Sequence, residues 1–178
     1  MYINNQPLYT DYSIMPLTLK EWLEYEESLT AKLISSTGSA QLELLFQNWI
    51  LADWWTKYVL QIHDSWVFVR EIVMKNNGIE YWYARTIIPQ HCYHANEAFF
   101  NRLNNESIRN LIFDEPRVQR INRYCYPVNS ECIEYQWVKK YVHSVNGTLW
   151  VRLAEYSIEQ SHSFYLLEIL LPPLENIP

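Results

Sequence analysis

The sequence predicts an α+β domain built on a single antiparallel sheet, and two hairpins with helices before and between their strands support this prediction. One hairpin joins residues 66–74 to 79–88 through Asn76-Asn77-Gly78, and Asn-Gly between β-branched and aromatic runs is the strongest short hairpin signal. A second hairpin is expected over 148–158 and 163–171. Because helices precede and interrupt mostly adjacent strands, the pattern favours α+β over alternating βαβ units.

The predicted helices begin near residue 18. Thr18–Glu21 fits a capping box for a short helix that continues to Glu26, and Ser28 can cap a second helix over Leu29–Ser36, which ends before Gly38. The other expected elements are a strand over 41–50, an ambiguous segment over 52–63, helices over 95–103 and 106–113, and strands over 118–126 and 133–143.

Composition limits the class of protein. Hydrophobic residues make up 49% of the 178 residues and charged residues 19%, which excludes a disordered chain and favours one domain over residues 1–178. Apolar runs fall short of the roughly 20 residues of a membrane helix, so no membrane insertion is expected. The net charge of −6 offers no basic surface, so we expect no nucleic-acid partner, and an anionic ligand would need a local cationic site.

The termini and cysteines favour the cytoplasm. Met1–Tyr12 is polar, without a basic stretch followed by an apolar run, so no signal peptide is expected. The three cysteines, at positions 92, 125 and 132, cannot form a disulfide framework and are expected to be reduced thiols. The segment His91-Cys92-Tyr93-His94 lacks further ligands at a suitable spacing, so no metal is expected.

The first hairpin carries an unusual pair of charges. If Asn77-Gly78 is a two-residue turn, paired residue numbers sum to 155, and Arg70 lies directly opposite Arg85 on one face. At about 6 Å and an effective dielectric constant of about 20, their repulsion is roughly 3 kcal/mol. Two explanations stay open: carboxylates of the protein, Glu168 among them, neutralise the arginines, or a bound carboxylate does so.

Glu168 is the second unusual charge. It lies in the run Phe164–Leu171, which is apolar on both faces, so the strand is predicted to be central and the carboxylate buried. A salt bridge to Arg152 or to the arginine pair is one reading, and a general acid or base with a shifted pKa is the other. The helix starts at Leu29 and Ile108 offer backbone N–H groups to an anion, but every helix start does so.

Four stretches resemble the bacterial chorismate pyruvate-lyase family in sequence and order. They are Glu26–Thr30, Val69–Ile72, Ala84–Pro89 and Leu167–Pro172, and Ser107–Phe113 is a looser fifth match. The resemblance implies conversion of chorismate to 4-hydroxybenzoate and pyruvate for ubiquinone synthesis, with no metal or redox cofactor. It also implies an antiparallel sheet with helices on one side that enclose a buried ligand cavity.

The resemblance assigns roles residue by residue. Arg70 matches the arginine that holds the ring carboxylate, and Leu29 and Ile108 match positions whose main-chain N–H groups assist it. Glu168 matches the carboxylate that contacts the ring hydroxyl and is the candidate acid or base. Arg85 matches a further arginine, which we assign to the second carboxylate of the substrate.

The chain departs from the family pattern at three places. Arg109 stands where a glycine is usual, Leu29 stands where methionine is familiar, and residues 114–147 are expected to form an insertion beside the cavity. A diverged member with another aromatic-acid substrate therefore stays open. The alternative is a non-catalytic module that binds small aromatic acids, related to regulator effector domains, although we find no helix-turn-helix in the sequence. The oligomeric state is not readable from these residues.

Overall fold

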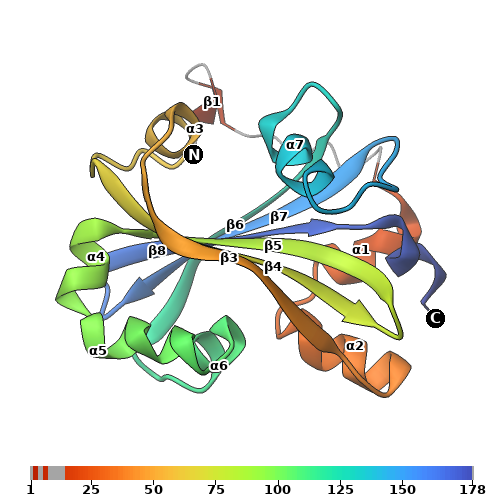
Figure 1. Ribbon diagram of the computed structural model, residues 1–178, viewed down its shortest axis with the longest axis horizontal. Coiled ribbons are helices and arrows are strands. Elements are labelled where there is room, and N and C mark those ends of the chain that lie inside the picture. The colour runs from red at the N-terminus through yellow and green to blue at the C-terminus, as the bar shows by residue number, and fades with distance from the viewer. Residues whose placement is uncertain (1, 4–5, 8–14, 178) are drawn as a thin grey trace.

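The protein is described by a computed structural model covering residues 2–3, 6–7 and 15–177. A six-stranded, fully antiparallel sheet runs through its centre in the order β3-β4-β5-β8-β7-β6 (Figure 1). The strands are β3 (Gln41–Leu51), β4 (Trp66–Asn76), β5 (Ile79–Pro89), β6 (Val118–Val128), β7 (Leu149–Ile158) and β8 (His162–Leu170). A separate pair joins β1 (Tyr2–Ile3) to β2 (Gln6–Pro7). The expectation of no signal peptide rests on Met1–Tyr12, and most of this stretch lies outside the described residues.

Helices cover both faces of this sheet, so the prediction of helices on one side was wrong (Figure 1). One face is covered by α1 (Leu17–Leu23), α2 (Leu29–Thr37), α4 (Gln90–Ala95), α5 (Glu97–Phe100) and α6 (Ile108–Phe113). The other is covered by α3 (Trp54–Tyr58) and α7 (Ile133–Lys139). Short 3₁₀ helices are η2 (Asn101–Asn104) and η3 (Pro172–Asn176). The central strands are apolar on both faces, so each face needs a helical layer.

Most predicted elements are present, but the segment 133–143 is not a strand. Its first part forms α7, where Glu134, Tyr135 and Val138 are buried at the spacing of one helix face. The strand expected over 118–126 is confirmed as β6. Within the described residues, no helix is both long and apolar enough to cross a membrane.

The first hairpin has the predicted turn but a different register beyond it. Asn77 and Gly78 take φ values of 50° and 78°, and Asn76 pairs with Ile79. A bulge then places Tyr81 as an extra residue, because Lys75 pairs with Glu80 while Met74 pairs with Trp82.

This bulge overturns the predicted arginine pair. A one-residue slip exchanges the two faces of a strand, so Arg85 lies opposite Glu71 and Arg70 lies opposite Thr86. Arg70 and Arg85 therefore project from opposite faces of the sheet. We call the face that carries Arg70 and Glu168 the pocket face, and the face that carries Glu71 and Arg85 the α7 face.

Candidate functional site

A pocket lies between the pocket face and the starts of α2 and α6. The space between its lining atoms is about 690 Å³ when the open solvent at its entrance is included. Its floor and walls are mostly apolar, and its polar residues come from β7, β8 and the two helix starts. The main lining residues are Ser28, Leu29, Ile72, Trp82, Ala84, Ile108, Arg109, Arg152, Tyr156 and Glu168.

Glu168 lies in the floor of this pocket, on the central strand β8. Its neighbours across the sheet are Ala84 on β5 and Arg152 on β7. The side chain is only 12% exposed, and both Glu168 and Ala84 line the pocket. Burial raises the pKa of Glu168, and the positive charge of Arg152 only partly opposes this effect. A carboxyl of this kind can exchange a proton nearer neutral pH than an exposed glutamate.

Arg152 is the cation of the pocket floor and is 2% exposed. Its Nε lies 3.5 Å from Oε2 of Glu168, and its Nη2 donates to the backbone oxygen of Glu27 at 3.5 Å. Within the described part of the chain, Nε and Nη1 are buried and make no hydrogen bond. A buried guanidinium with unused donors is costly, so it favours an anionic ligand beside it.

Arg70 shares the pocket face but lies beyond the residues that line the pocket. Arg70 pairs across the sheet with Thr86, and Thr86 pairs with Leu166, which lines the pocket. The Nε of Arg70 donates to Oε1 of Gln47 at 2.9 Å, whereas Nη1 is buried without a hydrogen-bond partner among the described residues. Burial lowers the pKa of Arg70, although an arginine stays protonated at neutral pH.

The two helix starts meet beside the pocket and contribute to its lining. Ser28 is the N-cap of α2 and accepts a hydrogen bond from Ala31 N at 3.3 Å. The same hydroxyl accepts from Nε of Arg109, at the start of α6, at 3.1 Å. Leu29 and Ile108 follow the two caps and both line the pocket, and first-turn N–H groups have no partner inside their helix.

Removal of the Ser28 hydroxyl gives a direct test of this junction. We expect Ser28→Ala to lower the free energy of unfolding by about 1 kcal/mol, because α2 loses its cap and Arg109 loses an acceptor. Urea unfolding measures the change. Ser28→Thr keeps a hydroxyl and is the control, and an equal loss in both variants would contradict the capping role.

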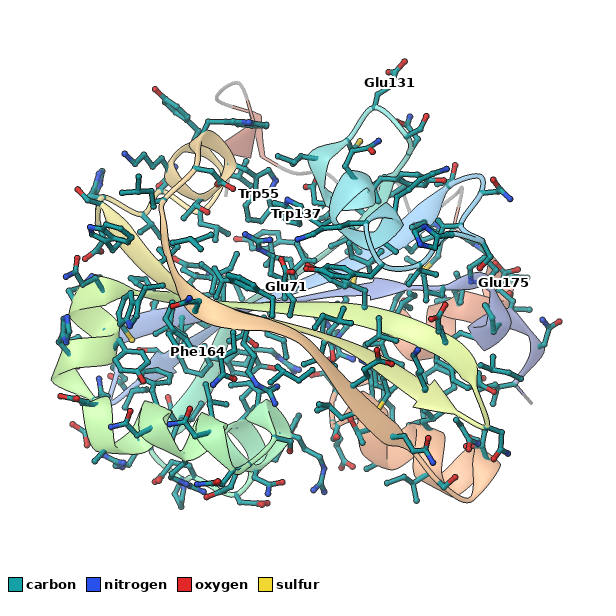
Figure 2. The ribbon with its side chains drawn as sticks, in the orientation of Figure 1. Trp55, Glu71, Glu131, Trp137, Phe164 and Glu175 are labelled. Carbon is teal, nitrogen blue, oxygen red and sulfur yellow. The ribbon has the colours of Figure 1, made fainter. Side chains whose placement is uncertain are left out.

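Arg85 does not reach this pocket. On the α7 face it forms a buried ion pair with Glu71, whose other oxygen accepts from the hydroxyl of Tyr141 at 2.7 Å. Trp137 of α7 covers the guanidinium, with 4.2 Å between Arg85 Cζ and the ring centre. Figure 2 shows Glu71 and Trp137 on the α7 side of the sheet and Phe164 on the other side. The structure thus brings Glu168, Leu29 and Ile108 to one pocket, with Arg70 behind its wall, and separates Arg85 from them.

The segment 114–147, expected as an insertion beside the cavity, pairs through β6 with the pocket strand β7 but does not line the pocket. All of it is described, and none of its residues lines the pocket; it forms the edge strand β6 and helix α7. Arg120 and Arg123 of β6 face the pocket side, but both are paired with Glu26 at the surface.

Sequence reasoning missed Arg152 as a pocket residue and considered it only as a salt-bridge partner. The available signal was one arginine in an otherwise apolar stretch of Leu149–Ala154, which is the pattern of a charged side chain in a central strand. Trp82 and Tyr156, which also line the pocket, carried no such signal because they resemble ordinary core residues. Within the described ranges, no group of three or more His, Cys, Asp or Glu residues could hold a metal ion.

Comparison with known proteins identifies the family. The family model described as chorismate lyase matches residues 6–174, which is nearly the whole chain. The chain belongs to the chorismate lyase family. A relative from Aromatoleum aromaticum named a probable chorismate pyruvate-lyase is 21% identical over 172 residues, covering 92% of this chain and 90% of its own. Another of the same name, from Nitrosomonas eutropha, is 27% identical over 106 residues, covering 59% of this chain and 60% of its own.

Solved structures share the fold of this chorismate lyase family member. The C-terminal domain of the histidine utilization repressor of Pseudomonas syringae pv. tomato superposes with a TM-score of 0.58 at 10% identity, covering 78% of this chain and 96% of that one. The effector domain of PhnF from Mycobacterium smegmatis gives 0.56 at 13% identity, covering 83% and 90%. At this identity the likeness concerns the arrangement of helices and strands alone.

Proposed function

We propose that the protein is a chorismate pyruvate-lyase, which converts chorismate to 4-hydroxybenzoate and pyruvate in the cytoplasm for ubiquinone synthesis. One observation carries the proposal: a buried carboxyl with a raised pKa, Glu168, lies beside a buried arginine in the floor of a mostly apolar pocket. Family membership and two relatives named probable chorismate pyruvate-lyases support the same reaction.

The ring carboxylate of chorismate is assigned to Arg70 and the two helix starts. Nη1 of Arg70 has no partner among the described residues and lies on the pocket face, and Leu29 and Ile108, which carry first-turn N–H groups, line the pocket. A carboxylate suits both kinds of donor, since charge-assisted hydrogen bonds are short and strong. Leu166 lines the pocket on the cross-strand row of Arg70. Arg70 therefore contacts the ligand when the Leu166 side chain moves, and we assign this contact to the substrate-bound state.

Glu168 is assigned as the base of an elimination. It takes the proton from ring carbon C4, the released electron pair forms a ring double bond, and the bond between C3 and the ether oxygen breaks. Enolpyruvate leaves with the bond electrons, gains a proton from solvent and becomes pyruvate, while the ring becomes the aromatic 4-hydroxybenzoate. Because aromatisation favours the products, the protein needs mainly to orient the substrate and exclude water.

The activity should depend on the ionisation of Glu168. Only the carboxylate accepts a proton, and burial raises its pKa above the ordinary 4.5, so kcat should fall as pH decreases through this raised value. In Glu168→Gln the residual kcat should not show this decrease at low pH. Initial rates measured from about pH 4.5, near the ordinary pKa of glutamate, to about pH 9 give the pH profiles of both proteins. A rate that instead falls as pH rises would contradict the role as a base.

Incubation of the purified protein with chorismate tests the proposed function. We expect 4-hydroxybenzoate and pyruvate in equal amounts, separated by chromatography, at a rate proportional to protein concentration. No conversion at high protein concentration would contradict the lyase. Binding of 4-hydroxybenzoate without any conversion of chorismate would instead support the binding module.

A further inference from the structure

We propose that Arg152 binds the second carboxylate of the substrate, the one on its enolpyruvyl group. The proposal rests on the proposed function and replaces the role first assigned to Arg85. That role is left open because Arg85 lies on the α7 face, where Glu71 already neutralises it. Chorismate carries two carboxylates, so a site that holds only the ring carboxylate would leave the other one buried and unpaired.

Arg152 is buried, charged and short of partners. It is 2% exposed, lines the pocket, and two of its three nitrogens make no hydrogen bond among the described residues. Among the described residues its ion-pair partner is Glu168 at 3.5 Å, a distance too long for a good hydrogen bond. A ligand carboxylate can bind the edge formed by Nη1 and Nη2, whose N–H donors are parallel, and it then gives Nη1 the partner that it lacks among the described residues.

Among the described residues, the other arginines near the pocket have different assignments, and Arg70 is assigned to the ring carboxylate. Arg120 and Arg123 both pair with Glu26 at the surface, and Arg109 donates to Ser28 beside the pocket. Arg120 and Arg123 add positive potential at Glu168 without lining the pocket themselves. Arg152 is therefore the guanidinium that combines burial, unused donors and direct access to pocket space.

Binding at Arg152 would also tune the base. In the free protein, the charge of Arg152 lowers the pKa of Glu168 against the effect of burial. A substrate carboxylate on Arg152 offsets that positive charge, so the pKa of Glu168 rises further and its carboxylate becomes a stronger proton acceptor. The base would then be strongest when the substrate with both carboxylates is in place.

The test compares two ligands that do not react. One is 4-hydroxybenzoate, and the other is 3-(carboxymethoxy)-4-hydroxybenzoate, which adds a carboxylate through an ether at the position of the enolpyruvyl group. Titration calorimetry gives both dissociation constants. We expect the wild-type protein to prefer the dicarboxylate by about 10- to 100-fold, and Arg152→Gln to lose most of this preference. Undiminished preference in Arg152→Gln, or none in the wild type, would overturn the proposal.

Three further variants make the assignment specific. Arg152→Lys keeps a charge without the fork and should retain an intermediate preference, which is the deciding result if Arg152→Gln does not fold. Arg117→Gln removes an exposed positive charge that does not line the pocket and should keep the full preference. Loss of the preference in Arg109→Gln but not in Arg152→Gln would transfer the role to Arg109 and overturn the proposal.

The two proposals fail in different ways. If the wild-type protein converts chorismate while its ligand preference is independent of Arg152, the lyase stands and the Arg152 assignment fails. If the preference depends on Arg152 but chorismate is not converted, the carboxylate site stands and the lyase fails.

Discussion

Glu168→Gln should lower kcat for chorismate by about 100- to 10,000-fold, the range that a positioned general base contributes. Glutamine has the same size and can hydrogen-bond to Arg152 and to a ring hydroxyl, but it cannot accept the C4 proton. The dissociation constant of 4-hydroxybenzoate should therefore change far less than kcat. Initial rates and titration calorimetry on the same preparation measure the two quantities.

A carboxyl on the other face provides the control. Glu155 lies on the neighbouring strand β7, faces away from the pocket and accepts a hydrogen bond from Asn122 at 2.9 Å. Glu155→Gln should leave kcat close to that of the wild type. If Glu168→Gln lost binding and turnover equally, Glu168 would be a binding residue rather than the base.

Arg85→Ala should lower the free energy of unfolding by about 3–5 kcal/mol, the cost of leaving one member of a buried ion pair alone. The variant leaves the Glu71 carboxylate beneath α7 without its ion-pair partner, although Tyr141 still donates a hydrogen bond to it. It also removes the cation under Trp137. Urea unfolding monitored by tryptophan fluorescence measures the loss. Because Arg85 lies across the sheet from the pocket, the cost should appear in stability rather than in KM for chorismate.

A double variant tests the explanation for that cost. Replacing Glu71 with leucine and Arg85 with methionine removes both charges and fills the space, so it should recover most of the lost stability. A raised KM in Arg85→Ala at unchanged stability would contradict the structural role and return Arg85 to the substrate site.

The sequence predicts where the main strands lie better than it predicts the sheet face to which each of their side chains projects. Asn77-Gly78 located the turn of the first hairpin because its positive φ values suit those residue types. The bulge at Tyr81 carried no comparable signal, since a tyrosine fits any position of a buried strand. One extra residue was enough to move Arg85 to the other face and to give it Glu71 as a partner.

The candidate site was predictable where a charge interrupts an apolar run. Glu168 was identified in this way, and Arg152 offered the same signal on the next strand. Their pairing across β7 and β8 depends on a register that only the folded sheet supplies. The helix starts at Leu29 and Ile108 are local features, but their meeting over one pocket depends on the packing of α2 and α6 against the sheet.

The most direct test of the account is a crystal structure of the protein with 4-hydroxybenzoate bound. The account predicts the ring between the starts of α2 and α6 and the floor of the pocket, with its hydroxyl within hydrogen-bond distance of Glu168. The ring carboxylate should lie toward Arg70, leaving Arg152 facing the space for the second carboxylate. A ligand bound on the α7 face near Arg85, or a ligand in the pocket that contacts neither Glu168 nor an arginine, would contradict it.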